Sequence, residues 1–114
     1  MASSANFKDF VMEQIAQSVL KGSPQLHFRK MFGEYFIYLN GQPAFLICND
    51  RVYVKQYEEL QTLLRDNERS IPFVGAKEWF VLDIENLEIL GKVVEIFEEI
   101  LPHYYSQKTK SKGI

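Results

Sequence analysis

The side chains that most often bind metals or act as nucleophiles are few in this chain and far apart in its sequence. His27 and His103 are its two histidines, and Cys48 is its one cysteine. A zinc site usually takes pairs of His or Cys ligands separated by only a few residues, and neither histidine has such a neighbour. We therefore predict no metal site and no cofactor.

The other reactive groups are better explained by structure than by catalysis. Cys48 ends an apolar run with no cationic side chain beside it, which indicates a buried and inert thiol. Asp50 and Arg51 are typical of a turn with a local ion pair. Gly33 and Gly41 are single turn glycines, outside any phosphate-binding pattern. We predict no catalytic residues.

The composition is that of one ordinary globular domain. The 114 residues are 46% hydrophobic and 25% charged. A single cysteine excludes an internal disulfide and fits a reducing compartment, and no run of about 18 apolar residues could span a membrane. The N-terminus has no apolar signal segment. We expect a cytoplasmic protein with one domain over 1–105 and a disordered basic tail over 106–114.

The charge pattern argues against direct binding to nucleic acid. The net charge is −2, and three positive charges belong to Lys108, Lys110 and Lys112 in the tail. Without them the remaining body carries about −5, whereas binding to a phosphate backbone requires a basic patch.

An antiparallel β-meander is the strongest structural signal. Asn40-Gly41 separates two runs rich in aromatic and branched residues and suits a type I′ turn, and Asn49-Asp50 separates the next pair of runs. Strands are predicted over 28–32, 35–39, 44–48 and 51–54. Shorter apolar runs over 71–73 and 79–82 predict one or two more.

Three helices are predicted beside this sheet, which makes the fold class α+β. Apolar residues recur at helical spacing over 7–20, 57–67 and 86–105. Ser4 or Asn6 is expected to cap the first helix, and Gly22 with Pro24 to end it. Pro102 predicts a stop or a kink in the last helix.

The last helix has two apolar stripes, one of which holds Ile89, Val93, Ile96 and Ile100. Together the stripes exceed the usual apolar arc of about 100°. Either the helix packs between the sheet and another helix, or one stripe faces a partner subunit.

Both faces of the sheet are also predicted to be apolar. With an even-numbered loop at Asn40-Gly41, alternation places two sets of residues on opposite faces. The first set is Phe36, Tyr38, Phe45, Ile47, Val52 and Val54. The second is Tyr35, Ile37, Leu39, Ala44, Leu46, Cys48 and Tyr53, with Arg51 and Lys55 at its margin.

Three helices can cover one face but hardly two, so we predict that the second face meets another subunit or a partner protein. The candidate partner face, including residues of the last helix, is Tyr35, Ile37, Leu46, Tyr53, Ile89, Val93 and Ile96.

One family resemblance rests on the meander. The residues that carry it are Arg29, Met31, Phe32, Gly33, Tyr35, Ile37, Tyr38, Asn40, Gly41, Phe45, Ile47, Asn49, Asp50, Arg51, Tyr53 and Lys55. In this pattern the chain resembles the TfoX/Sxy N-terminal domain from about Phe7 to Tyr105. The resemblance implies helices packed on an antiparallel sheet, similar to the two-layer secretion-chaperone-like fold. It also implies a link to transcription coactivators of competence genes.

Two functions stay open at this point. The first is a non-catalytic protein-interaction domain with a regulatory role, which binds a partner protein or self-associates as a homodimer. The alternative is a small-ligand-binding protein or an enzyme with a pocket between sheet and helices, lined by Tyr35, Tyr53 and Trp79.

Overall fold

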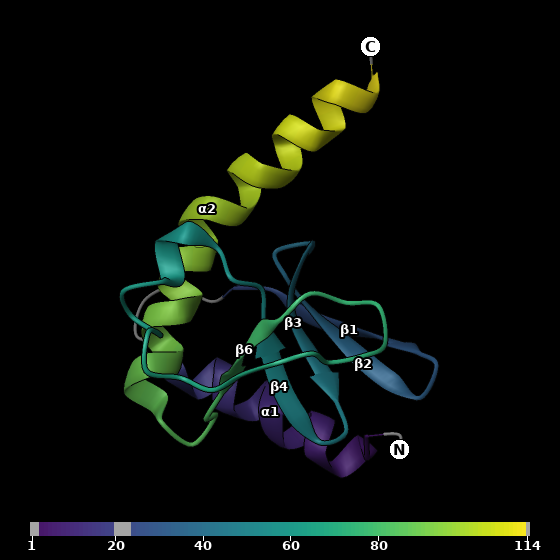
Figure 1. The fold of residues 1–114 in the computed structure, drawn as a ribbon, viewed down its shortest axis with the longest axis vertical. Helices are drawn as coiled ribbons and strands as arrows, with labels where there is room; N and C mark the ends of the chain where they lie inside the picture. The colour runs from purple at the N-terminus through teal and green to yellow at the C-terminus, as the bar shows by residue number, and fades with distance from the viewer. Residues whose placement is uncertain (1–2, 20–23, 114) are drawn as a thin grey trace.

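The fold is a single sheet with helices on one side. Within residues 3–19 and 24–113, the part of the chain that the computed structural model describes, six strands form one antiparallel sheet in the order β1-β2-β3-β4-β6-β5. Side chains are described as far as Tyr104. The elements are α1 Ala5–Ser18, β1 Leu26–Met31, β2 Glu34–Leu39, β3 Gln42–Cys48, β4 Arg51–Val54, the 3-10 turn η1 Glu58–Leu60, β5 Arg69–Ser70, β6 Trp79–Leu82 and α2 Leu87–Gly113 (Figure 1).

The predicted meander is confirmed, and its turns explain its regularity. Both residues of the Asn40-Gly41 turn have positive φ, 52° and 86°, as a type I′ turn requires. The same combination recurs at Phe32-Gly33 and at Asn49-Asp50. Three such turns connect β1 to β4 without a long loop.

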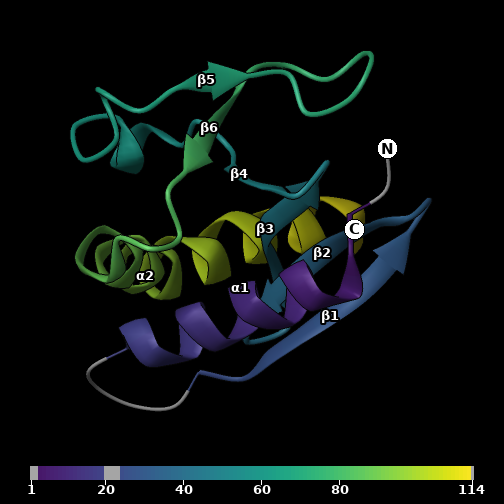
Figure 2. The ribbon, with the colours of Figure 1, turned by 90° about the horizontal axis from the view of Figure 1, so that it is seen from below.

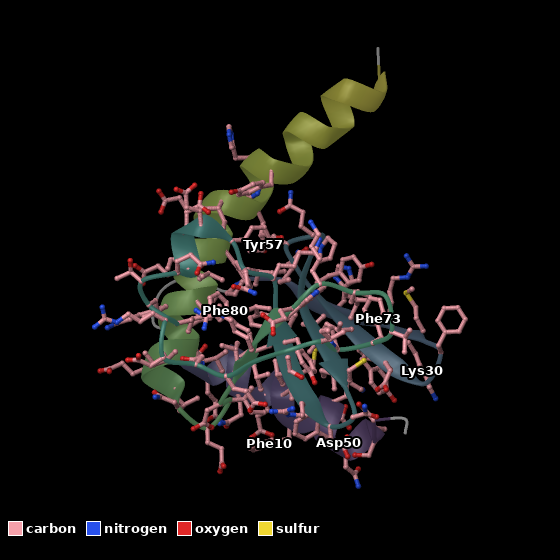
Figure 3. All side chains as sticks on the ribbon, in the orientation of Figure 1. Phe10, Lys30, Asp50, Tyr57, Phe73 and Phe80 are labelled. Carbon is pink, nitrogen blue, oxygen red and sulfur yellow. The ribbon has the colours of Figure 1, made fainter. Side chains whose placement is uncertain are left out.

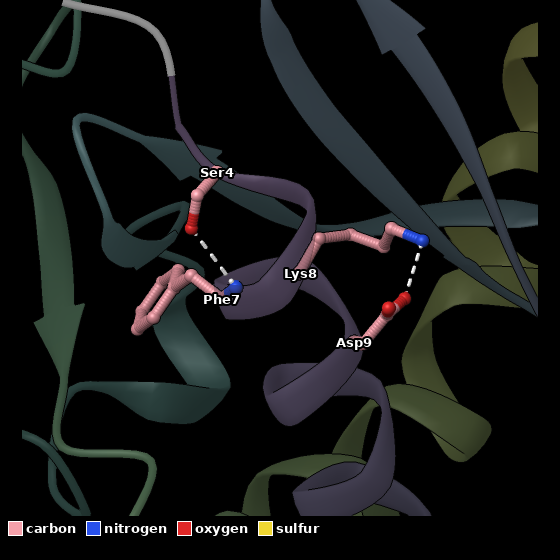
Figure 4. Close-up of polar contacts among 4 residues, drawn as sticks. All are labelled: Ser4, Phe7, Lys8 and Asp9. Carbon is pink, nitrogen blue, oxygen red and sulfur yellow. Dashed lines mark hydrogen bonds and ion pairs between the residues drawn. The ribbon is translucent and has the colours of Figure 1, made fainter.

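Helix α1 begins where the sequence predicts. The Ser4 hydroxyl oxygen accepts a hydrogen bond from the backbone N–H of Phe7 at 3.0 Å, which satisfies one free donor of the first turn (Figure 4). Val11, Ile15 and Ser18 form its buried face. The helix ends at Ser18, whereas the predicted terminator Gly22 lies outside the described residues.

Helix α2 packs on the sheet, on η1 and on α1, so both of its stripes face this chain's own core. The cluster of buried residues includes Leu90, Val93, Val94, Phe97, Ile100 and Leu101, with Ile89 and Ile96 packed against it. The sequence left two arrangements open for this helix, and the structure has the one in which the helix packs between the sheet and another helix. The second stripe is therefore not a bare partner surface.

Pro102 bends α2 and does not end it. The proline lies inside the helix, which continues to Gly113. Its ring removes one backbone hydrogen bond, and Figure 1 shows the axis changing direction between the green and yellow parts. Most of segment 106–114, for which composition predicts disorder, therefore has helical backbone, through residue 113.

The predicted middle helix over 57–67 is wrong. The structure has only η1, followed by turns over 61–66. The backbone bonds Gln61 N to Glu58 O and Asn67 N to Leu64 O span three residues, as in 3-10 geometry. Leu60 and Leu64 are nevertheless buried, as their spacing indicates. The described residues thus contain two α-helices, and packing of the two leucines does not require a third.

The sixth strand is confirmed and the fifth is displaced. β6 matches the run over 79–82, but the run over 71–73 is not a strand, because β5 is the preceding pair Arg69–Ser70. Pro72 has no N–H to donate to a ladder. The β5–β6 loop, residues 71–78, crosses the face of the sheet opposite α1 and α2 (Figures 1 and 2).

The predicted assignment of strand residues to faces is wrong for β2. The register shifts between Ile37, which pairs with Phe45, and Tyr38, which pairs with Pro43, so Ala44 is an extra residue on β3. Such a bulge exchanges the two faces of one strand relative to the other. Tyr35 and Ile37 therefore belong to the helix-covered core.

Candidate functional site

The outer face of the sheet, defined as the face opposite α1 and α2, has its own apolar cluster. Paired residues form a row across five strands: Arg29, Phe36, Leu46, Tyr53 and Val81. Leu46, Cys48 and Tyr53 are buried there, with Phe36, Trp79 and Val81 packed against them. The bulge at Ala44 places Phe36, and not Tyr35, on this face.

The centre of the outer face is not bare, contrary to the expectation from the sequence. Leu46 and Tyr53 are each only 3% exposed within one protomer. The β5–β6 loop crosses this face, and its Pro72 is buried (Figure 2). An open area remains at one side, lined by residues of β1, β2 and β3, by Lys55 after β4, and by residues of the β5–β6 loop and β6.

This open area is the outer groove, of about 510 Å³. Most of its walls are aromatic or aliphatic, and two of its lining residues are cationic. Residues used below are Arg29, Phe36, Tyr38, Lys55, Phe73 and Trp79. No carboxylate is among the residues that line it in the described structure. The groove thus combines flat apolar surfaces with positive charge in a chain of net charge −2.

The two cations of the groove are available to a ligand. The Lys55 ammonium lies 5.8 Å from the centre of the Trp79 ring. The ion pairs between described side chains are Lys8–Asp9 and Arg51–Glu68, so neither Arg29 nor Lys55 is in one. The sequence predicted that Arg51 pairs with Asp50, and its actual partner is Glu68, which is brought near by tertiary structure.

Exposed apolar side chains border the outer groove. We call Met31, Phe32, Phe73 and Val74 the apolar rim; their exposed fractions are 40%, 100%, 51% and 100%. Met31 and Phe73 line the groove, and the other two are their sequence neighbours. Figure 3 shows Phe73 on the loop in front of the sheet. Large side chains that remain in water at the edge of a groove are typical of an interaction site.

The polar groups at the β1–β2 and β3–β4 turns have a structural role. The Glu34 carboxylate accepts hydrogen bonds from the Ser3 hydroxyl at 2.6 Å and from the Ser3 N–H at 3.0 Å. Asp50 accepts from the Ser4 N–H at 2.9 Å. These bonds attach the start of the chain to two of the meander turns.

Cys48 is not a nucleophile in this environment. Burial, and then the neighbouring Glu34 carboxylate, raises the pKa of its thiol to about 11. The thiol is therefore neutral at physiological pH, and the reactive thiolate is scarce. This agrees with the prediction of a buried inert thiol.

The seven residues of the predicted partner face do not form one surface. Tyr35, Ile37 and Val93 are in the core under the helices, and Ile89 and Ile96 pack against that core. Leu46 and Tyr53 lie on the outer face. The alternative pocket is divided in the same way, because Tyr35 faces the helices whereas Tyr53 and Trp79 lie on the other side.

Sequence reasoning missed Arg29 and Phe73, and placed Lys55 only at the margin of the face. A sequence signal for Arg29 did exist, since alternation along β1 places it beside Phe36 once the register is known. Phe73 gave no such signal, because its position depends on the path of the β5–β6 loop.

A second groove, of about 720 Å³, lies between the end of α1 and the first half of α2. Glu88, Glu95 and Glu98 line it together with Val19. Val19 is the last described residue before the gap at 20–23, so we assign no function to this groove. The described residues contain no group of three or more His, Cys, Asp or Glu side chains suited to a metal ion. They also contain no helix long and apolar enough to cross a membrane.

Comparison with known proteins adds one relative. The chain is similar to a protein of Spirochaeta aurantia described as an uncharacterized 12.7 kDa protein in the trpE 5' region, with 27% identity over 116 residues. The match covers 98% of this chain and 95% of the relative, so it extends over the whole fold. No family model matches the chain, and the resemblance to the TfoX/Sxy N-terminal domain stays a prediction.

Proposed function

We propose that this protein is a non-catalytic interaction domain that binds a segment of another protein in the outer groove. The observation that carries the proposal is that aromatic walls, an exposed apolar rim and two cations occur at one place, and that neither cation forms an ion pair with another described side chain. Apolar anchors in such a groove would supply affinity, and the cations would supply orientation.

The lining of the groove supports binding over chemistry. Its lining residues in the described structure include no Ser, Cys, His, Asp or Glu, the side chains that most often serve as nucleophiles and general bases. His27 lies beside it and stacks on Tyr38, with ring centres 5.1 Å apart and planes 8° from parallel. This stacked pair extends the flat surface of the groove.

The resemblance to the TfoX/Sxy N-terminal domain supports a partner that belongs to the transcription machinery. The negative net charge also favours a protein over DNA as the direct partner. A regulatory cofactor that acts through protein contacts is consistent with both.

A small aromatic anion is the second candidate ligand. The groove volume of about 510 Å³ is within the usual range of small-molecule sites, roughly 300–1,000 Å³. A thermal-shift screen with aromatic carboxylates and nucleotides tests it, and stabilisation that Trp79→Ala removes would favour this candidate.

Selection from a random peptide library on the immobilised protein tests the proposed function. We expect enriched peptides that bind the wild type and lose binding to the Phe73→Ser variant. The matched control is Phe10→Ser on α1, because Phe10 is similarly exposed, at 41% against 51%, and is not among the residues that line the groove. Figure 3 labels both residues. Failure to enrich any peptide, or equal loss in the two variants, would contradict the proposal.

A further inference from the structure

We infer that the segment bound in the outer groove is an extended peptide with the pattern acidic-x-apolar-x-acidic, in which the apolar residue is large. This inference rests on the proposed function and names the chemistry of its partner. It follows from the spacing of the two cations and from the surface between them.

The cations lie at opposite sides of the groove. Arg29 is on β1, and its row continues through Phe36 and Leu46 to Tyr53 on β4. Three strand spacings of ~4.8 Å make this row about 14 Å long. Lys55 is two residues after Tyr53, one step of ~7 Å along the strand on the same face. The two backbone positions are thus about 16 Å apart.

An extended peptide can place one carboxylate near each of two cations whose backbone positions lie this far apart. Residues i, i+2 and i+4 of an extended chain point to the same side and span about 13 Å. Both side chains line the groove, and the difference between about 13 Å and about 16 Å is within the reach of an arginine or lysine side chain, so carboxylates at i and i+4 can meet them. Arginine and lysine bind carboxylates through strong charge-assisted hydrogen bonds.

The residue at i+2 lies over the apolar centre of the groove. Phe36, Tyr38 and Trp79 form the floor and one wall, and Phe73 stands on the loop that crosses the outer face (Figure 3). An aromatic or large aliphatic side chain fits this position, because flat rings pack well against other rings.

A single-stranded nucleic acid would also combine flat rings with negative charge, and the charge balance favours the peptide. The groove has two cationic lining residues, and the chain has a net charge of −2 and an isoelectric point of about 5.7. A polyanion would experience repulsion outside the groove that a short acidic segment largely avoids.

Fluorescence polarisation tests the inference: labelled synthetic peptides are titrated with the full-length protein. The probe is Asp-Ser-Trp-Ser-Asp, compared with Lys-Ser-Trp-Ser-Lys, Asp-Ser-Ser-Ser-Asp and the shortened Asp-Trp-Asp. We expect the probe to bind at least roughly tenfold more tightly than each of the others. The double variant Arg29→Glu with Lys55→Glu is expected to reverse the preference toward the lysine peptide.

Lys30→Glu is the matched control, because Lys30 is exposed on the same strand and pairs with Tyr35, which places it on the opposite face. This variant is expected to leave the preference unchanged. A reversed preference in the double variant distinguishes loss of the two cations from unfolding, since an unfolded variant would bind neither peptide. Equal binding of the acidic and basic peptides would overturn the inference, as would an equal effect of Lys30→Glu.

The outcomes also separate this inference from the proposed function. Library peptides that bind in the groove without an acidic pair would overturn the inference and leave the interaction domain standing. Tighter binding of a mixed-sequence single-stranded oligonucleotide, lost in the double variant, would overturn the inference in favour of nucleic acid. The absence of any peptide binding would reject both.

Discussion

A Cβ atom placed on Gly91 of α2 would lie 2.6 Å from the backbone carbonyl oxygen of Ser18 in α1. Glycine is therefore the residue that lets the two helices approach closely at this point. Both helices cover the same side of the sheet, so their spacing determines how well the core is filled.

We expect Gly91→Ala to destabilise the protein by about 1–3 kcal/mol, because α2 must move away from α1. The greater helix propensity of alanine offsets up to about 1 kcal/mol of this cost. Urea unfolding followed by circular dichroism measures the difference. The control is Glu99→Ala on the exposed side of α2, with an expected change within about 0.5 kcal/mol. A neutral or stabilising Gly91→Ala would show that the helix contact is not tight.

Ser4→Ala removes the hydroxyl that caps α1 and is expected to cost about 1 kcal/mol of unfolding free energy. Ser4→Asn is the matched control, because its amide oxygen also accepts the Phe7 N–H and adds no negative charge beside Asp50. Equal losses in the two variants would mean that the contact with Phe7 is not what matters.

The stability is expected to fall at alkaline pH because of Cys48. Its thiol has a pKa of about 11 in the fold and 9.0 ordinarily, so the fold favours the neutral form. The contribution is complete below pH 9 and declines as the pH rises toward about 11, with a total loss of roughly 2–3 kcal/mol. Urea unfolding across this pH range measures it. The Cys48→Ala variant should show a shallower decline, and an unchanged slope would assign the effect to other groups.

We expect self-association to use the apolar rim, because its side chains are 40–100% exposed, whereas the second stripe of α2 and the centre of the outer face are covered within one protomer. We expect the double variant Phe32→Asn with Val74→Ser to remove any concentration dependence of the sedimentation coefficient. Asparagine tolerates the positive φ of 54° at position 32. A strictly monomeric wild type at high concentration would contradict the predicted homodimer.

The meander and the start of α1 follow from the sequence, since their causes are local. Asn40-Gly41 tolerates positive φ at both turn positions, and the neighbouring runs of aromatic and branched residues form strands. Ser4 caps α1 from three residues away. The inert character of Cys48 also follows from its apolar neighbours.

The candidate site depends on tertiary structure. One extra residue, Ala44, exchanges the faces of β2, and nothing in the local sequence indicates it. Phe36, Trp79 and Val81 then pack against Leu46 and Tyr53, and the path of the β5–β6 loop places Phe73 at the groove that Arg29 and Lys55 also line. Strand pairing and loop packing are long-range contacts, whose energies depend on residues far apart in the chain. The sequence thus determines the strands of the meander and the positions of the two α-helices, whereas packing decides that 57–67 is not a helix, where β5 lies and which side chains share a surface.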